Sequence, residues 1–360
     1  MNSSIVSSRA ASLTPYVAGE QPQNRKYIKL NTNESPYPPP PSVSAQLRDY
    51  DAEGLRLYPD PQFTAPRRIL AERYSLDPEE VFFGNGSDEI LSFAFFAFFD
   101  PDNGPVLFPE HTYSFYPVYC TFYGLSSRRL PLCKDFSIDL NDYINEKEHA
   151  GVVIANPNAP TGISIERRTI ESFLRSYRSD RICIIDEAYV DFGAESCASL
   201  IRDFPNLLVV HTFSKSRCLA GLRVGFALGD RKLIKTLFAV KDSFNSYPLN
   251  RMTQDITCTV LQEEDYFLDI RGRIIETREN VTWRLRKSGW EVLPSKANFI
   301  FARFPGVEGA EIYRRLKEEG ILVRHFSHRG IEDFIRITIG TDADMETFFT
   351  TLQSLGFIRR

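Results

Sequence analysis

Short apolar runs alternate with helical patterns through the middle of the chain. The runs lie at residues 81–83, 106–108, 151–155, 182–185, 207–211 and 225–228, and each is followed by a turn containing Gly, Pro, Asn or Asp. Amphipathic patterns, for example at 165–177, lie between them. Apolar strands separated by helices are typical of a parallel sheet that helices cover on both faces. The pattern therefore predicts an α/β fold.

The pattern changes after about residue 260. Residues 265–288 predict one long charged helix, whose arginines at 271, 273 and 278 we interpret as a solvated face. Strands are expected at 290–293, 298–303, 321–324 and 334–338, with helices at 309–319 and 344–355. Strands and helices mixed in this way predict a smaller α+β domain.

The first forty residues are polar and contain four consecutive prolines at 38–41. Proline excludes regular helix interiors and central strands, so this segment is expected to be an arm that packs on the small domain. The predicted organisation is an arm at 1–45, a large domain at 46–260 and a small α+β domain at 261–360.

Composition narrows the class of protein. The chain has 360 residues, of which 42% are hydrophobic, and a net charge of −4. This size predicts a large core, and the charge disfavours nucleic acid or an anionic membrane as the main partner. The most apolar helix candidate, 90–99, is far shorter than the roughly 20 residues that span a bilayer. We expect it in the core or in a subunit interface.

The N-terminus, the cysteines and the histidines predict an intracellular enzyme without a metal. The N-terminus has no apolar stretch after a basic start, so no signal peptide is expected. The six cysteines are scattered without a C-x-x-C pair, which predicts reduced thiols in a cytoplasmic protein. His325 and His328 lack the spacing and the third ligand of a zinc site, so no metal is predicted.

Four chemically distinct groups stand at or after the carboxyl ends of the predicted strands. Asp186 and Tyr189 follow the run at 182–185, and Lys215 and Arg223 follow the run at 207–211. Ligands of doubly wound sheets bind at this edge. These are the groups that pyridoxal phosphate requires. A lysine forms the imine, a carboxylate binds the pyridine nitrogen, a phenol binds the ring hydroxyl and an arginine binds the phosphate.

The acid and the phenol also have ordinary structural explanations. Asp186 either caps the turn that follows it or pairs with a cationic ring, and Tyr189 either packs in the core or donates to the ring oxygen. Lys215 lies between apolar segments, where desolvation would lower its pKa and supply a neutral amine. Arg223 can bind phosphate oxygens as a bidentate donor, with hydroxyls from Thr212 and Ser214.

A glycine-containing segment, 84–89, precedes the predicted apolar helix. Its Gly86, Ser87 and Asp88 are expected either to form a phosphate cradle at the helix N-terminus or to form a simple capped turn. The segment lacks the third glycine of the dinucleotide-binding motif, so a nicotinamide cofactor is disfavoured.

Taken together, the motifs resemble those of fold-type I pyridoxal-phosphate-dependent aminotransferases of class II. The resemblance rests on NPNAPTG at 156–162, DEAY at 186–189, TFSK at 212–215 and AGLR at 220–223. A narrower resemblance, to the histidinol-phosphate aminotransferase family, adds LTPY at 13–16, LNTNE at 30–34, LYPD at 57–60, GSDE at 86–89, YP at 247–248, LVR at 322–324 and IRITIGT at 335–341. The matches cover nearly the whole chain in the order of the family.

The resemblance implies a fold, a cofactor and a set of roles. The large domain is expected to hold a mostly parallel seven-stranded sheet, and the cofactor is expected to be pyridoxal 5′-phosphate. Lys215 would carry the cofactor and move the proton, Asp186 would bind the ring nitrogen, and Tyr189 the ring hydroxyl. The remaining cofactor-binding residues would be Gly86, Ser87, Asp88, Tyr113, Asn158, Thr212, Ser214 and Arg223, with Tyr113 on the ring face.

The resemblance also implies a dimer and a substrate. Tyr58 would reach the phosphate of the other subunit in a homodimer. The substrate side would be lined by Tyr16, Asn33, Tyr247, Arg324 and Arg336. The implied reaction is transamination between L-histidinol phosphate and 2-oxoglutarate in histidine biosynthesis. Threonine-phosphate decarboxylation in cobalamin synthesis and transamination of aromatic amino acids are the alternatives, and a non-catalytic protein that keeps the fold is disfavoured because Lys215 is present.

One position departs from the family pattern. The family commonly has Asn directly before Pro-Thr-Gly, where it donates to the ring hydroxyl, but this chain has Ala159 there and Asn158 one residue earlier. Either Asn158 turns into the site, or Tyr189 holds the ring oxygen alone. A single neutral hydrogen bond contributes only about 1 kcal/mol, so the residues leave both alternatives open.

Overall fold

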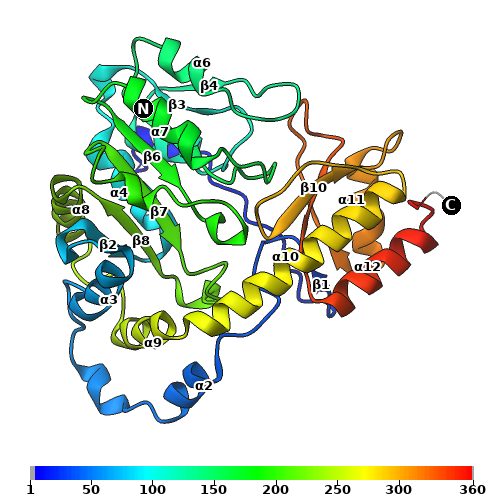
Figure 1. Cartoon of the computed structure of the whole chain (residues 1–360), viewed down its shortest axis with the longest axis horizontal. Coiled ribbons are helices and arrows are strands. Elements are labelled where there is room, and N and C mark those ends of the chain that lie inside the picture. The colour runs from blue at the N-terminus through cyan, green and yellow to red at the C-terminus, as the bar shows by residue number, and fades with distance from the viewer. Residues whose placement is uncertain (1–4, 359–360) are drawn as a thin grey trace.

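The computed structural model describes residues 5–358, so the outermost residues of the predicted arm and small domain, 1–4 and 359–360, lie outside the described residues. Figure 1 shows a larger part built around one sheet and a smaller part that carries the C-terminus. The long helix α10 (Glu264–Lys287) runs from one part to the other.

The larger part contains a seven-stranded sheet in the order β2-β8-β7-β6-β5-β3-β4. Its strands are β2 (Val81–Gly84), β3 (Val106–Pro109), β4 (Ser127–Leu130), β5 (Gly151–Ala155), β6 (Ile182–Asp186), β7 (Leu207–Thr212) and β8 (Gly225–Gly229). Only β8 runs against its neighbours β7 and β2, and the other pairs are parallel. The predicted α/β fold with a mostly parallel sheet is confirmed. The edge strand β4 was not predicted, because its residues before Leu130 are exposed and polar.

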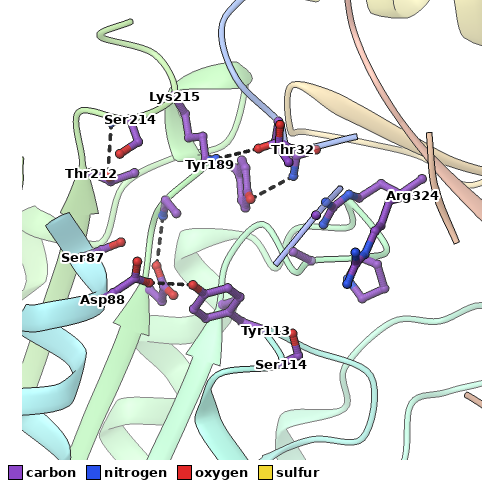
Figure 2. Close-up of a pocket in the computed structure, with 18 of the residues that line it drawn as sticks. Thr32, Ser87, Asp88, Tyr113, Ser114, Tyr189, Thr212, Ser214, Lys215 and Arg324 are labelled. Carbon is purple, nitrogen blue, oxygen red and sulfur yellow. Dashed lines mark hydrogen bonds between the residues drawn. The ribbon is translucent and has the colours of Figure 1, made fainter. Parts of the chain in front are cut away.

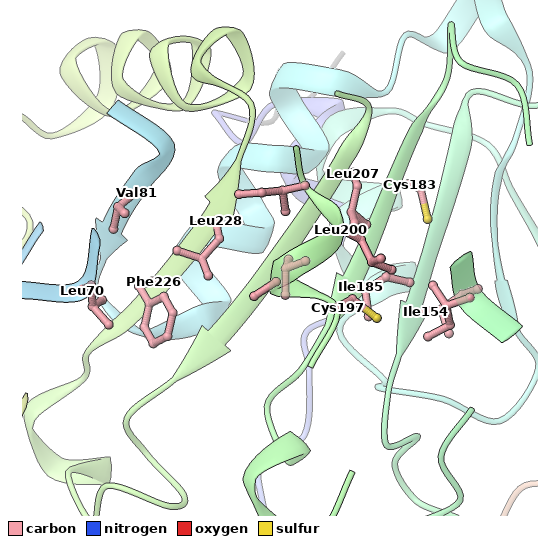
Figure 3. Close-up of a cluster of buried hydrophobic side chains, with 14 of the residues drawn as sticks. Leu70, Val81, Ile154, Cys183, Ile185, Cys197, Leu200, Leu207, Phe226 and Leu228 are labelled. Carbon is pink, nitrogen blue, oxygen red and sulfur yellow. The ribbon is translucent and has the colours of Figure 1, made fainter. Parts of the chain in front are cut away.

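Alternate residues of each strand pack on opposite faces of the sheet. On one face, helices α3 (Thr64–Tyr74), α7 (Arg167–Ser176) and α9 (Arg251–Gln262) cover a core that includes Ile154, Ile185 and Leu207 (Figure 3). On the other face, α4 (Gly86–Phe98), α5 (Tyr116–Tyr123) and α8 (Arg231–Phe244) cover residues such as Ile184. Asp186 alternates with Ile184, so its carboxylate lies on the face of α4 and α5.

The smaller part has its own core around a four-stranded sheet in the order β12-β13-β10-β9. These strands are β12 (Arg324–His325), β13 (Ile335–Thr338), β10 (Phe299–Arg303) and β9 (Glu291–Val292), and the helices beside them are α11 (Gly309–Glu318) and α12 (Asp342–Ser354). The single strand expected at 321–324 is wrong. Its first half is β11 (Ile321–Leu322), which pairs with another segment, and only Arg324 enters the four-stranded sheet.

The partner of β11 comes from the N-terminal segment. Strand β1 (Ile28–Lys29) pairs with β11 in parallel, so this part of the chain lies against the small sheet (Figure 1). Helix α2 (Pro41–Arg48) begins at the last of the four prolines, a first-turn position at which the missing N–H costs nothing. The boundaries at 45 and 260 stay predictions, although α9 and α10 do meet near the second one.

Short elements complete the described chain. They are α1 (Ser8–Ala11), α6 (Leu140–Asn145) and the 3-10 turns η1 (Ala52–Arg56), η2 (Pro78–Glu80), η3 (Pro101–Asn103), η4 (Val190–Phe192), η5 (Ala198–Leu200) and η6 (Ala220–Leu222). No helix within residues 5–358 combines the length and the apolar character that crossing a membrane requires.

The predicted solvated arginine face of α10 is wrong for two of its three residues. Arg278 is among the most buried side chains of the described protein and donates through Nη1 to the carbonyls of Phe192 and Ala297, at 2.8 and 2.9 Å. The Arg271 side chain is 13% exposed and lies in an ion-pair network. Composition alone could not distinguish these arginines from Arg273, because they are buried by segments from elsewhere in the chain.

Candidate active site

A pocket opens at the carboxyl ends of β5, β6 and β7, between the large sheet and the small part of the molecule (Figure 2). Most of the predicted site residues line it. They are Tyr16, Asn33, Ser87, Asp88, Tyr113, Asp186, Tyr189, Thr212, Ser214, Lys215, Arg223, Arg324 and Arg336. The parallel strands explain this convergence, because loops that follow adjacent parallel strands meet at one edge of the sheet.

Lys215 lies three residues beyond the end of β7 and points into the pocket (Figure 2). Its Nζ donates to the carbonyl of Thr32 at 3.1 Å, and it lies 5.9 Å from the centre of the Tyr189 ring. Burial, together with the neighbouring guanidinium of Arg336, lowers the pKa of Lys215 to about 8. A substantial fraction of the amine is therefore neutral near pH 8, as a nucleophilic lysine requires.

Asp186 is the last residue of β6 and is buried beside α5. Its Oδ2 accepts a hydrogen bond from the hydroxyl of Tyr116 at 2.9 Å, and its Oδ1 accepts one from the backbone N–H of Ala188 at 3.2 Å. Burial raises the pKa of Asp186 to about 6, although both donors favour the ionised form. A buried carboxylate without a cationic partner is suited to bind a protonated heterocyclic nitrogen.

Tyr189 and Asn33 form one unit on the wall of the pocket. The Asn33 amide Nδ2 donates to the Tyr189 hydroxyl at 2.9 Å, which leaves the hydroxyl proton of Tyr189 able to donate elsewhere. Asn33 has a positive φ of 56° and is fixed by Thr338, whose hydroxyl donates to Asn33 Oδ1 at 2.9 Å. The N-terminal segment thus positions the Tyr189 side chain, which follows β6 at the edge of the large sheet.

The N-terminus of α4 faces the guanidinium of Arg223. Arg223 donates through Nη2 to Asp88 Oδ2 at 2.9 Å and through Nη1 to the Ser214 hydroxyl at 3.3 Å. Gly86 has a φ of +79°, and a Cβ there would lie 2.5 Å from Arg223 Nη2, so another residue would be strained and would displace the guanidinium. Helix N–H groups, hydroxyls and an arginine in one place form a phosphate-binding arrangement. Neither Ser87 nor Asp88 caps the helix with its side chain, which disfavours the simple capped turn.

Asn158 does not line the pocket, whereas Ala159 does. The buried Asn158 amide donates to the carbonyl of His111 at 2.9 Å and to the Thr161 hydroxyl at 3.2 Å, and its Oδ1 accepts from Thr112 at 2.8 Å. Both amide hydrogens are therefore used within the protein. This arrangement favours the alternative in which Tyr189 binds the ring oxygen, while Asn158 holds the segment that carries Tyr113.

Two arginines line the opposite end of the pocket without a carboxylate partner among the described residues. Arg324 donates only to the carbonyls of Val17 and Ala18, at 3.1 and 3.4 Å, and Arg336 donates to the carbonyl of Asn31 at 3.1 Å. The buried Nε of Arg336 has no hydrogen-bond partner within residues 5–358. Burial lowers the pKa of Arg336 below its usual range.

Tyr58 and Tyr247 do not reach the pocket of their own chain. They stack on each other with ring centres 4.6 Å apart, and their exposed fractions are 78% and 40%. The predicted roles of these two residues require a second copy of the chain, and they stay predictions.

Sequence reasoning missed three contributors to the site. Tyr116, which donates to Asp186, is one turn from Tyr113 and could have been found from the apolar face of its helix. Thr32, which accepts from Lys215 through its carbonyl, acts through its backbone and so gives no residue-type signal. Phe326 lines the substrate end beside Arg324.

The residues present fit pyridoxal phosphate as a group. The buried carboxylate, the lysine amine, the hydroxyl of Tyr189 and the phosphate-binding helix terminus lie around one pocket. The fold and this site together define an enzyme of the pyridoxal-phosphate-dependent transferase class.

Comparison with known proteins places the chain within this class. Residues 25–352 match the family model described as aminotransferase class I and II. The chain is 52% identical to the histidinol-phosphate aminotransferase of Syntrophus aciditrophicus (strain SB), over 98% of both chains. The chain therefore belongs to the class I and II aminotransferases and, within them, to the histidinol-phosphate aminotransferase family, and its cofactor is pyridoxal phosphate.

Solved structures show the same fold in more than one enzyme. The histidinol-phosphate aminotransferase of Sinorhizobium meliloti, in complex with pyridoxal-5′-phosphate, aligns with a TM-score of 0.83 at 24% identity over 92% of both chains. The L-threonine-O-3-phosphate decarboxylase of Porphyromonas gingivalis aligns with a TM-score of 0.78 at 24% identity, over 91% of this chain and 99% of that chain. The fold alone therefore does not choose between these two reactions.

Proposed function

We propose that the protein transfers the amino group of L-histidinol phosphate to 2-oxoglutarate, giving imidazole acetol phosphate and L-glutamate in histidine biosynthesis. The observation that carries this proposal is the pair of arginines, Arg324 and Arg336, which line the lysine pocket without an ion-pair partner among the described residues. Two unpaired guanidinium groups suit a phosphate monoester in one half-reaction and a dicarboxylate in the other.

The rest of the pocket is consistent with an aromatic substrate body. Tyr16 packs on Phe115 with ring centres 4.4 Å apart, and Phe326 lies against Arg324 and Arg336. An imidazole ring can stack on such walls while its phosphate binds the arginines. The same walls also suit aromatic amino acids, whose transamination is one of the alternatives that the sequence leaves open.

In the proposed reaction, pyridoxal phosphate supplies the electron sink that makes the substrate Cα–H acidic. Asp186 keeps the heterocyclic nitrogen protonated, because an ionised carboxylate in a buried site favours the adjacent cation. The Tyr189 hydroxyl would donate to the ring oxygen. The neutral amine of Lys215 would act as the base that takes the substrate Cα proton and as the acid that gives it back, which requires Nζ to be held in place.

We also propose a cytoplasmic homodimer in which Tyr58 completes the phosphate site of the partner subunit. The support is that Tyr58 lies outside its own pocket and is highly exposed, as are Leu55 and Leu57 of the same segment. A group of exposed apolar side chains in one place fits a surface that another copy covers. All six cysteines are free thiols, which suits a reducing compartment.

The experiment that tests the proposed substrate compares L-histidinol phosphate with L-histidinol, which lacks only the phosphate. With 2-oxoglutarate as acceptor, we expect kcat/KM for L-histidinol to be lower by about two to four orders of magnitude, since buried donors would be left unpaired. Phenylalanine and tyrosine serve as the aromatic comparison. Equal kcat/KM for histidinol and its phosphate would refute the role of the arginines, and a preference for tyrosine would establish an aromatic aminotransferase.

A further inference from the structure

A chain of hydrogen-bonded charged side chains lies directly behind Lys215. Ser216, the next residue, is buried and donates its hydroxyl to Oδ2 of Asp191. The other oxygen of Asp191 accepts from Nη1 of Arg271 at 3.1 Å. Neither Ser216 nor Asp191 lines the pocket. The residue that follows the lysine is therefore fixed by a carboxylate outside the site.

These contacts close into a ring. Arg271 also donates through Nη2 to Oε1 of Glu264 at 2.5 Å, and Oε2 of Glu264 accepts from Nη1 of Arg217 at 2.7 Å. Arg217 follows Ser216, so the ring returns to the segment that carries Lys215. Burial alone would raise the pKa values of Asp191 and Glu264, but Arg217 and Arg271 hold both below their usual range. The carboxylates of the ring are therefore ionised at neutral pH.

The ring joins three segments that are far apart in the sequence. Asp191 lies in η4, directly after Tyr189, and Arg271 and Glu264 lie in the first turns of α10. Further along α10, Arg278 donates to the carbonyl of Phe192, also in η4. The turn that follows Tyr189 is thus held by α10 at two points, and the segment that follows Lys215 is held to the same turn.

Such a support matters because Lys215 lies outside the sheet. Strand β7 ends at Thr212, so the strand ladder does not reach the lysine. The proposed proton transfer requires Nζ to lie within about 3 Å of the reacting carbon, and errors of about 1 Å can cost a hundredfold in rate. The bond from Nζ to the Thr32 carbonyl fixes the tip of the side chain, and hydrogen bonds from the residue next to Lys215 fix its backbone.

We propose that Asp191 and Ser216 are positioning residues, which fix Lys215 relative to Tyr189 without touching cofactor or substrate. This inference rests on the proposed role of Lys215 as the reacting amine and is independent of which substrate the enzyme uses. Loss of the Ser216–Asp191 bond should loosen the segment that carries Lys215, so that Nζ leaves the Thr32 carbonyl and is more fully solvated. Water solvates the ammonium form better than the pocket does, so the pKa of Lys215 rises toward its ordinary value.

The test measures the Lys215 amine in the apoenzyme, without substrate or cofactor. Ser216→Ala removes the donor, and Asp191→Asn removes the charge while keeping the shape. Trace labelling with acetic anhydride across pH 6–11, with the Lys215 peptide quantified by mass spectrometry, gives the pKa of that one amine. We expect about 8 for the unmodified protein and a rise of about one unit in each variant.

The matched control is Thr277→Ala, on the same helix. Its hydroxyl donates to Oδ1 of Asp342 at 2.7 Å, so the control also removes a hydroxyl–carboxylate bond. This bond lies further along α10 than Glu264 and Arg271, the two residues of that helix in the ring. We expect the Lys215 pKa to be unchanged in this variant. Thermal unfolding of each apoprotein establishes that it is folded; if Asp191→Asn does not fold, Ser216→Ala decides the question.

Two outcomes would overturn the inference. One is a folded Ser216→Ala protein in which Lys215 titrates as in the unmodified protein, and the other is an equal rise in Thr277→Ala. Because the labelling reports on Lys215 alone, a wrong assignment of the substrate would leave the result intact. Absence of any lowered Lys215 pKa in the unmodified protein would instead count against the proposed role of Lys215 itself.

Discussion

Replacing Tyr116 by Phe should make cofactor binding depend on pH in the neutral range. The Tyr116 hydroxyl donates to Asp186 Oδ2 at 2.9 Å, and this bond stabilises the ionised carboxylate. A hydrogen bond to a charged group contributes about 1.5–3 kcal/mol, and one pKa unit corresponds to about 1.4 kcal/mol. The pKa of Asp186, about 6 in the unmodified apoenzyme, should therefore rise by about one to two units in Tyr116→Phe.

The effect on binding follows from the fraction of ionised Asp186. At pH 7 a carboxyl with a pKa of about 6 is about nine-tenths ionised, whereas one with a pKa of about 7–8 is between about one-half and one-tenth ionised. If only the ionised form binds the protonated ring nitrogen, the affinity for pyridoxal phosphate at pH 7 should fall about two- to tenfold. At pH 9, where the carboxyl is ionised in both proteins, the difference should largely disappear.

The assay is an absorbance titration of the apoenzyme with pyridoxal phosphate at pH 6, 7, 8 and 9. Tyr119→Phe is the matched control, because Tyr119 lies on the same helix but donates to the backbone carbonyl of Asp88 at 3.0 Å. We expect the control to shift affinity equally at every pH or not at all. A Tyr116→Phe profile parallel to that of the unmodified protein would refute the assignment of Asp186 as the ring-nitrogen partner.

Three further predictions concern the lysine, the long helix and the dimer. The pKa of Lys215 is about 8 in the folded apoprotein and lies below its value in the unfolded chain, so the unfolded chain binds more protons between pH 8 and 10.5. The free energy of unfolding in urea should therefore rise with pH in this window. Lys215→Met should remove that rise. Arg278→Met leaves the carbonyls of Phe192 and Ala297 unpaired and should cost about 2–4 kcal/mol of unfolding free energy, measured by urea denaturation; a loss below about 0.5 kcal/mol would contradict the buried contacts. Tyr58→Ala and Lys215→Met should each lack activity, and mixing them after dissociation should restore part of it, because one hybrid site has both residues; no recovery would argue against the shared site.

Much of the fold was predictable because the large sheet is buried on both faces. Six of its strands, β2, β3 and β5 to β8, are short apolar runs, and such runs stand out in a sequence. Strand β4 has no such run, since it lies at the exposed sheet edge. The division of residues 321–325 between two sheets depends on which segment pairs with which, and local pattern carries no information on that.

The site was predictable where a side chain itself performs the chemistry. Asp186, Lys215 and Arg223 have residue types that the cofactor requires and positions at strand ends. Contacts made by backbone atoms, and ion pairs between residues far apart in the sequence, could not be predicted from the residue type at one position. Thr32 contributes a carbonyl, and Asp191 and Arg271 are partly buried because three distant segments meet behind the lysine.

Transamination of a phosphorylated amine can be separated from decarboxylation in one reaction mixture. It contains purified enzyme, pyridoxal phosphate, 2-oxoglutarate and either L-histidinol phosphate or L-threonine phosphate, and glutamate and carbon dioxide are measured together. We expect glutamate formation that requires both histidinol phosphate and 2-oxoglutarate, with no carbon dioxide released from threonine phosphate. Carbon dioxide release from threonine phosphate without 2-oxoglutarate, and no glutamate from histidinol phosphate, would contradict the proposed transamination.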